Sequence, residues 1–182
     1  MTKDILSSNF FELFDLPVSY AVDLQKAQQQ YMELQKQVHP DKFANASDQE
    51  KRLSMQQTSW INEAFTTLKD DVLRATYLLK LKGTDINLEN ETTMDAVFLM
   101  QQLEMRERLE NIKQESDPLD VLDSMAKEIK LMATEMMQGF ADCYASEQTE
   151  QAREWIRKLQ FMQKAKKEIN LRTAELEDEL MS

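Results

Sequence analysis

The sequence predicts an all-α protein built from two helical modules: an N-terminal helical hairpin with short flanking helices, then a C-terminal three-helix bundle. The 182 residues include only 2 Gly and 3 Pro, so few points interrupt regular structure. Ala, Leu, Met, Gln, Glu and Lys are abundant, and all of them favour helix. Apolar residues also recur at intervals of three and four along most of the chain, which is the helical period.

The composition narrows the class of protein. A chain of this length suits one domain or two small ones and can bury a substantial core. The sequence contains no run of about 18 apolar residues, so no membrane span is predicted. The start "MTKDILSSNF" resembles neither a secretory signal nor a transit peptide. The single Cys excludes an internal disulfide and a Cys-rich zinc site. We therefore expect a cytoplasmic protein without a metal or cofactor.

The net charge of -11 is unevenly distributed. Residues 1–82 hold 10 Lys and Arg against 11 Asp and Glu, whereas residues 83–182 hold 12 against 22. This sign disfavours binding to nucleic acid, which requires cations at the phosphates. The asymmetry has two interpretations: modules with different partners, or an acidic solvated face that maintains solubility.

The first module begins with a short apolar helix in "NFFELFDLP", which should end before Pro17. Asp23 is the predicted N-cap of the next helix. One face of that helix carries apolar residues: Leu24, Ala27, Tyr31, Leu34 and Val38. The opposite face is polar: Lys26, Gln29, Glu33 and Lys36. The helix should end at the tripeptide His39-Pro40-Asp41.

A loop and two further helices complete this module. Ser47 and Glu50 form a predicted capping box at the start of the first of them. Its predicted inner stripe consists of Leu53, Trp60, Ala64 and Leu68, with Ile61 beside it. The second, in "DVLRATYLLKLK", should end with Gly83 as its C-cap. The module should therefore span residues 1–83, followed by a polar linker at 84–91.

The second module, residues 92–182, should contain three long helices. Thr92 or Thr93 is the expected cap of the first, Asp117 with Pro118 begins the second, and Ser146 begins the third. Two segments show coiled-coil spacing, which predicts an antiparallel hairpin. The seam of the second helix is Leu119, Leu122, Ala126, Ile129, Ala133, Met136, Phe140 and Cys143. The seam of the third is Trp155, Leu159, Met162, Ile169, Leu176 and Leu180, broken by Lys166 and Thr173. Cys143 is expected to be an inert core thiol.

The first helix of this module has two apolar faces. One face comprises Met94, Phe98, Met105, Leu109 and Ile112. The other comprises Leu99, Met100 and Leu103, flanked by Glu104 and Glu107. Phe161 likewise lies about 200° from the seam position Leu159 on its own helix. This uncovered strip is either a protein-binding patch or the surface that packs on the first module.

The only histidine, His39, lacks partners for catalysis in this chain. No Gly-x-Ser-x-Gly elbow is present, and Cys143 is expected in the core. Zinc requires several His or Cys ligands, and the chain has one of each. The chain has no Gly-rich phosphate loop, so the sequence does not predict that it binds ATP. The tripeptide at 39–41 is then either a simple helix stop, with Asp41 bonding local backbone, or a contact surface.

The surrounding sequence resembles the J domain of DnaJ-type co-chaperones. The resemblance covers residues 9–82 and rests on "HPDKF" between two amphipathic helices, followed by "INEAFTTLKD" and "LRATYLL". In a chain of this length, "FLMQQLEMRERLE" and "RKLQF" extend it to the HscB family, the J-type co-chaperones of iron–sulfur cluster assembly. The resemblance implies a co-chaperone rather than an enzyme.

The resemblance also implies two partners and their contact residues. The J domain would stimulate the ATPase of HscA, a DnaK-type chaperone, through His39, Pro40, Asp41, Lys36, Lys42 and Lys26. The C-terminal module would bind the iron–sulfur scaffold IscU through Leu99, Met100, Leu103, Glu104, Glu107 and Phe161. The helix that precedes His39 is Gln-rich and only lightly basic for this family. This predicts that its electrostatic docking on the chaperone is weak and exchanges rapidly.

Two other functions are compatible with the residues. The chain could be a J-domain co-chaperone for a different client protein, because the acidic C-terminal half could bind another basic or apolar partner. It could also be an autonomous hydrolase that uses His39, although neither a nucleophile nor a pocket is evident for it. Substrate turnover without any chaperone partner would distinguish the hydrolase from both co-chaperones.

Overall fold

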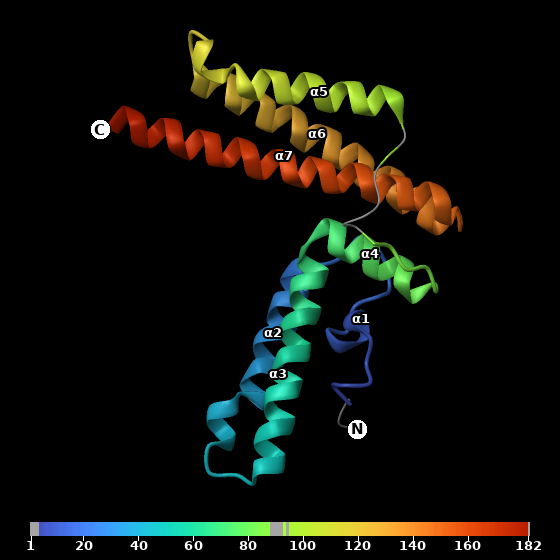
Figure 1. The fold of residues 1–182 in the computed structure, drawn as a ribbon. Coiled ribbons are helices and arrows are strands. Elements are labelled where there is room, and N and C mark those ends of the chain that lie inside the picture. The colour runs from blue at the N-terminus through green and yellow to red at the C-terminus, as the bar shows by residue number, and fades with distance from the viewer. Residues whose placement is uncertain (1–3, 88–92, 94, 182) are drawn as a thin grey trace. The chain divides into compact units, whose positions relative to one another are not determined.

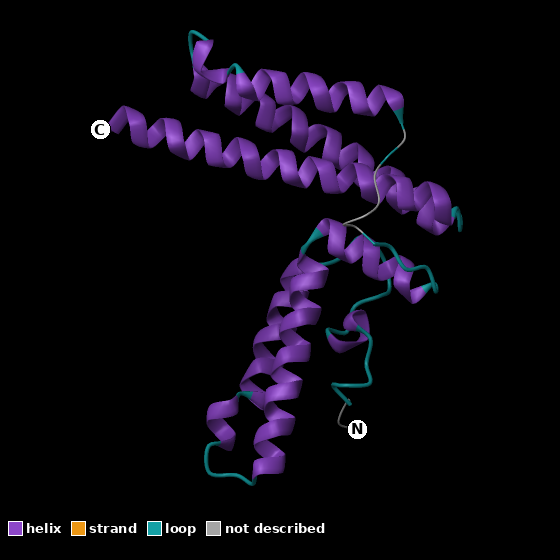
Figure 2. Ribbon diagram, in the orientation of Figure 1, coloured by secondary structure: helices purple, strands orange, loops and turns teal. Residues whose placement is uncertain are grey.

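The structure, a computed structural model, describes residues 4–87, 93 and 95–181. These residues form helices and no strands, as the sequence predicts (Figure 2). The chain divides into two compact units, residues 1–83 and 84–182. Unit 1 contains α1 (Phe10–Leu13), α2 (Leu24–Val38), η1 (Pro40–Phe43), α3 (Asp48–Lys69) and α4 (Asp71–Leu81). Unit 2 contains α5 (Ala96–Glu110), η2 (Ile112–Gln114), α6 (Pro118–Ala145) and α7 (Thr149–Met181).

Unit 1 is an antiparallel hairpin of α2 and α3, flanked by α1 and α4 (Figure 1). The pair is joined by stacking of Tyr31 on Phe65, with ring centroids 4.5 Å apart. Asn62 on α3 accepts hydrogen bonds from the Tyr31 hydroxyl (3.0 Å) and from Gln35 (2.6 Å). The short turn η1 lies at the end of the hairpin away from α4. The hairpin therefore holds residues 39–43 at its tip.

The buried face of α3 differs from the predicted stripe at two positions. Ile61, Ala64 and Leu68 are buried, but Leu53 is exposed and Ser54 is buried in its place. A buried serine needs a hydrogen-bond partner, and the Ser54 hydroxyl donates to the carbonyl of Val38 at 2.6 Å. The hydrophobic pattern alone could not predict this polar contact.

The motif "LRATYLL" has a structural role in α4. Its Arg74 is buried, and its guanidinium donates to the carbonyls of Tyr20 (2.9 Å) and Leu68 (2.7 Å) and to the carboxylate of Asp71 (2.6 Å). Burying a cation without partners costs much free energy, and these three contacts offset that cost for Arg74. Tyr77 of the same motif stacks on Phe10 at 4.2 Å, and burial raises its pKa. The stacking on Phe10 joins α1 to α4, whereas the Arg74 contacts attach α4 to the segment before α2 and to the end of α3.

Most of the predicted helix ends are confirmed. Asp23 caps α2, Ser47 and Glu50 form the capping box of α3, and Asp117 caps α6 with Pro118 in its first turn. Gly83 follows the end of α4 with a φ of 83°, a left-handed conformation that favours glycine. α1 ends at Leu13, several residues before Pro17.

Two predicted caps in unit 2 are wrong. α5 is capped by Asp95 rather than Thr93, whose hydroxyl instead accepts the amide hydrogen of Asp95 and donates to Glu154. Ser146 is the C-cap of α6, and α7 begins at Thr149 after a turn in which Glu147 has a φ of 59°. The expected cap Thr92, the apolar-face residue Met94 and positions 88–91 of the expected linker lie outside the described residues.

Unit 2 is built on the antiparallel pair of α6, with 28 residues, and α7, with 33 (Figure 1). The predicted hairpin is confirmed, and its seam agrees with the prediction at all buried positions of α6 except Met125 and at Leu159, Met162 and Ile169 of α7. On α6 the buried residues are Leu122, Met125, Ile129, Met136 and Phe140. On α7 they are Ala152, Ile156, Leu159, Met162, Ala165 and Ile169. Ile156 and Ala165 thus replace the predicted Trp155 and bridge the gap at Lys166, while Leu180 is exposed.

Trp155 packs against Gly139 of α6 instead of filling the seam. A Cβ atom on Gly139 would lie 2.5 Å from a carbon of the Trp155 indole. Glycine inside a helix lowers stability by about 1 kcal/mol relative to alanine. The indole leaves no room for a Cβ atom, which explains why position 139 holds glycine in spite of this cost. The ammonium group of Lys158 lies over the same indole, 5.0 Å from the ring centroid, in a cation–π contact.

We predict that Gly139→Ala destabilises unit 2, although alanine is the better helix former. The added methyl group must displace the indole, and overpacking of this kind costs about 1–3 kcal/mol. Urea unfolding of the full chain, followed by circular dichroism, measures the effect. In a Trp155→Leu background the same substitution should be neutral or stabilising, because the ring is gone. A Gly139→Ala chain at least as stable as the original would contradict this packing.

Candidate functional site

The tripeptide His39-Pro40-Asp41 forms the tip of the hairpin in unit 1. α2 ends at Val38, and His39 has an extended backbone (φ -55°, ψ 129°) that leads into η1. Pro40 has no amide hydrogen and disfavours helix at the residue before it. The predicted helix stop is therefore confirmed, and it is also the start of a 3-10 turn.

The carbonyl of Val38 is left without the amide donor that a continuing helix would supply, because Lys42 donates its amide to His39 instead. α3 provides the replacement. Ser54 donates to this carbonyl at 2.6 Å, and Thr58 reaches it at 3.4 Å. The turn at 39–43 is thus attached to α3 by side chains from two successive turns of that helix.

The His39 imidazole closes the turn. Its Nδ1 atom accepts the amide hydrogen of Asp41 at 3.3 Å, so in the neutral ring the proton lies on Nε2. The Asp41 carboxylate is 3.5 Å from the same nitrogen. The side chains of His39 and Asp41 are 52% and 90% exposed, so both are open to solvent. This geometry suits contact with another protein.

Of the three lysines predicted to contact the chaperone, Lys36 and Lys42 lie beside the tripeptide and Lys26 lies elsewhere on α2. Lys42 lies in η1, and Lys36 lies in the last turn of α2, where it pairs with Glu33 at 2.9 Å. Lys26 lies near the start of α2, about 20 Å of helix from His39, and its ammonium donates to the carbonyl of Asp15 at 2.5 Å. All three are exposed.

A second candidate surface lies on α5. Phe98, Met105 and Leu109 are buried, followed by Ile112 of η2, which confirms one apolar face for the described residues. On the other face Leu99, Met100 and Leu103 are 37%, 64% and 60% exposed. Glu104 and Glu107 on the same side are also exposed. This exposed apolar strip with acidic flanks is typical of a protein-binding surface.

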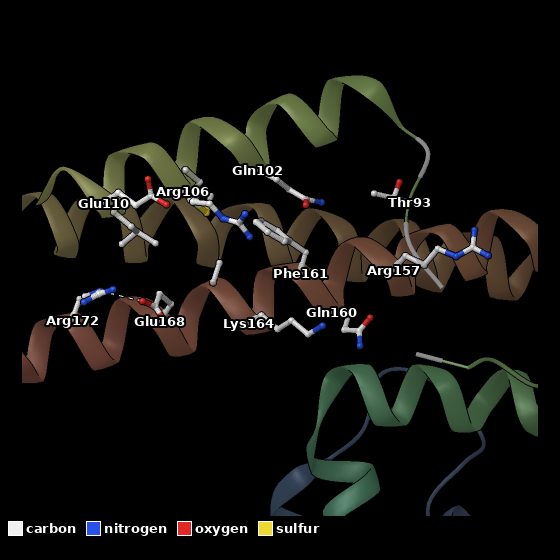
Figure 3. A pocket seen from close by; sticks show the side chains of 13 residues that line it. Thr93, Gln102, Arg106, Glu110, Arg157, Gln160, Phe161, Lys164, Glu168 and Arg172 are labelled. Atoms are coloured by element: carbon white, nitrogen blue, oxygen red, sulfur yellow. Dashed lines mark ion pairs between the residues drawn. The ribbon is translucent and has the colours of Figure 1, made fainter. Parts of the chain in front are cut away.

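Phe161 lies apart from that strip. It is half-buried on α7, where its ring meets Phe98 edge to face with centroids 5.6 Å apart. It lines a groove of about 620 Å³ between α5 and α7 (Figure 3). The predicted single patch is therefore two adjoining surfaces, namely the outer face of α5 and the groove beside it.

Ion pairs hold α5 at each end. Asp95, its N-cap, pairs with Lys158 of α7 at 2.6 Å, and this hydrogen bond lowers the pKa of the Asp95 carboxyl. Arg108 in the last turn pairs with Glu128 of α6 at 2.7 Å and lowers the pKa of that carboxyl. The middle of α5, which carries Leu99 to Leu103, has Phe98 and Met105 as the buried residues at its two ends.

The described residues offer little else that could carry chemistry. They contain no group of three or more His, Cys, Asp or Glu side chains placed to hold a metal ion. Among the same residues, no helix has the length and apolar character to cross a membrane. Cys143 is a free thiol, only half-buried rather than sealed in the core.

Comparison with known proteins gives a consistent result over both units. The family model described as the HSCB C-terminal oligomerisation domain matches residues 94–170. The co-chaperone protein HscB homolog of Shewanella halifaxensis is 47% identical over 165 residues, which cover 88% of this chain and 94% of that protein. The homolog of Shewanella woodyi is 44% identical over the same coverage.

Solved structures agree with this result. The structure of chaperone HscB from Vibrio cholerae superposes with a TM-score of 0.83 at 36% identity, covering 95% of this chain and 99% of that one. Human co-chaperone protein HscB gives a TM-score of 0.82 at 29% identity, covering 91% and 82%. The yeast co-chaperone Jac1, at 22% identity, shares the fold with a TM-score of 0.66.

The exposed His-Pro-Asp tip on a four-helix N-terminal unit, followed by a three-helix unit, defines a J-type co-chaperone. Within that class, the chain belongs to the HscB family, the co-chaperones of iron–sulfur cluster assembly. Its relatives are named as co-chaperones rather than as enzymes.

Several residues of these surfaces could not be found from the sequence. Ser54 lies next to the predicted apolar stripe and not on it, and its role depends on a carbonyl 16 residues earlier. The groove residues Arg106 and Lys164 come from separate helices without a shared local pattern. Only the position of Phe161 off its seam signalled that α7 contributes to the surface.

We predict that Ser54→Ala destabilises unit 1 and loosens the turn at 39–43. The Val38 carbonyl would keep only the long contact with Thr58, and a buried acceptor left without its donor costs about 1–3 kcal/mol. Thermal unfolding and amide hydrogen exchange at residues 38–44 measure the two effects. Ser59→Ala, at an exposed site on the same helix, is the matched control and should change neither. Unchanged exchange in the Ser54 variant would show that this bond does not hold the turn.

Proposed function

We propose that this co-chaperone stimulates ATP hydrolysis by a DnaK-type chaperone, HscA, and delivers the iron–sulfur scaffold protein IscU to it. The observation that carries the proposal is the division of two exposed surfaces between two units. One is the His39-Pro40-Asp41 tip, and the other is the apolar strip of α5 with the adjoining Phe161. Each surface suits a protein partner.

The chaperone contact consists of the tripeptide with Lys36 and Lys42 around it. Their exposure and the attachment of the turn to α3 support a rigid, pre-formed contact, which lowers the entropy lost on binding. Lys36 forms an ion pair with Glu33, and Lys26 lies at the far end of α2 from the tripeptide. Lys26 therefore belongs to the outer part of the contact, and docking depends more on shape than on charge.

The scaffold contact consists of Leu99, Met100 and Leu103 on α5, Phe161 in the groove, and Glu104 and Glu107 at the edge. Burial of a leucine or methionine side chain contributes about 1.5–3 kcal/mol. The two carboxylates would select a partner with cations beside its own apolar residues, which gives specificity and a faster encounter.

The two surfaces on one chain explain delivery. A scaffold held by unit 2 reaches a chaperone held by unit 1 at an effective concentration set by the linkage, rather than by the dilute solution. Hydrolysis stimulated at that moment traps the scaffold on the chaperone and favours cluster transfer. We place this work in the cytoplasm, where the single free Cys143 is kept reduced.

We predict that His39→Gln abolishes stimulation of HscA ATPase and leaves IscU binding unchanged. Glutamine cannot reproduce the ring that closes the turn with Asp41. Steady-state ATP hydrolysis by HscA, with and without IscU, measures stimulation, and calorimetry measures binding. Loss of both would contradict the division of functions between the units. Wild-type chain that does not stimulate HscA would contradict the proposed function itself.

We predict that Leu103→Ala with Phe161→Ala weakens IscU binding by at least about 30-fold. Each truncation removes a candidate hot spot worth about 2 kcal/mol, and one such loss alone corresponds to about 30-fold, which is the lower bound because hot-spot losses are not additive. Leu131→Ala is the matched control, because Leu131 is 63% exposed on α6, much like Leu103, and lies outside this surface. A dissociation constant that the double variant shares with the control would exclude the surface. Capture of another protein by unmodified chain, with IscU left unbound, would favour a different client.

A further inference from the structure

The groove between α5 and α7 has a charge opposite to that of its surroundings. Unit 2 is strongly acidic, since residues 83–182 hold 12 Lys and Arg against 22 Asp and Glu. The groove reverses this ratio. Its cations are Arg106, Arg157, Lys164 and Arg172, and its anions are Glu110 and Glu168. A local reversal of this kind selects for a ligand of the opposite sign.

The cations differ in what they already bind. Arg157 and Arg172 pair on α7 with glutamates about one turn away. Arg106 and Lys164, one on each wall, form no ion pair within the part of the chain that the structure describes. Both are exposed, so their charges are available to a ligand at the Phe161 ring.

Their positions place them next to the proposed scaffold contact. In Figure 3, Arg106 extends from α5 toward the Phe161 ring, and Lys164 follows one turn later on α7. The two lining carboxylates, Glu110 and Glu168, lie toward the end marked by Arg172. On α5, Arg106 lies about 60° around the helix from Leu103 and about 80° from Phe98, so it separates the outer strip from the groove. A partner that covers both Leu103 and Phe161 must cross Arg106.

We infer that the groove binds an acidic segment of the scaffold protein, in which an apolar side chain covers Phe161 and carboxylates pair with Arg106 and Lys164. The outer edge of α5 carries Glu104 and Glu107, the opposite sign. The surface is therefore ordered from negative at the outer edge, through apolar, to positive in the groove. A client that carries the complementary order can dock in one direction only, since reversed docking would oppose like charges.

This inference rests on the proposed function, and a charge-reversal experiment separates the two. Binding of IscU to full-length chain is measured by calorimetry at low and moderate salt. Arg106→Glu with Lys164→Glu should raise the dissociation constant by about tenfold, because two exposed attractions become repulsions. The loss should shrink as salt increases, since exposed charges are screened.

Two controls accompany the measurement. Lys166→Glu makes the same change at an exposed site about 200° around α7 from Lys164 and should leave binding unchanged. Arg106→Lys with Lys164→Arg retains both charges and should keep most of the affinity.

The outcomes are distinct. Equal binding by the charge-reversed and control variants, with Leu103→Ala still weakening it, would overturn the acidic-segment inference alone. A charge reversal that alters self-association but not IscU binding would also overturn it, because a second copy of the chain would then occupy the groove. No IscU binding by unmodified chain would overturn the proposed function as well.

Discussion

The pyrrolidine ring of Pro40, which disfavours helix at His39, is the constraint on which the tip of unit 1 depends. It ends α2 at Val38 and leaves a carbonyl that the helix itself cannot satisfy. Ser54 on α3 supplies the hydrogen-bond donor for the Val38 carbonyl. The same bond therefore pairs the last carbonyl of α2 and fixes the register of α3 against α2. The turn is then short enough for the His39 ring to reach the amide of Asp41. The lone imidazole is thus a structural group that closes the turn, and under the proposed function it is also a contact group for the chaperone.

Unit 2 follows from a different constraint, the narrow buried face of α5. α6 and α7 bury one another along a continuous seam and need little from a third helix. α5 rests on that pair through Phe98, Met105 and Leu109, and ion pairs to α6 and α7 hold its two ends. Its remaining apolar residues stay in solvent, and a groove remains beside α7. Exposure of this much apolar surface is unfavourable for an isolated unit and useful for one that binds a partner.

The sequence predicted features that depend on neighbouring residues and was less successful with features that depend on distant ones. Asp23, the Ser47 and Glu50 pair, and Asp117 with Pro118 each cap a helix through contacts within three residues, so their pattern is complete in the sequence. Thr93 and Ser146 have the same chemistry as true caps but not the position. Asp95 caps α5 by accepting the amide hydrogen of Phe98, and it also binds Lys158, 63 residues later, a contact that no local pattern predicts.

The sequence by itself determined the all-α class, the hairpins, the His39-Pro40-Asp41 turn and the two-faced character of α5, because helical periodicity and local hydrogen bonding are encoded within a few turns of chain. Only the tertiary structure decided that Ser54 supports the turn and that Phe161 faces a groove instead of joining the outer strip. Each of these depends on the distance between atoms on different helices. That distance is set by how side chains pack, which the period of a single helix does not specify.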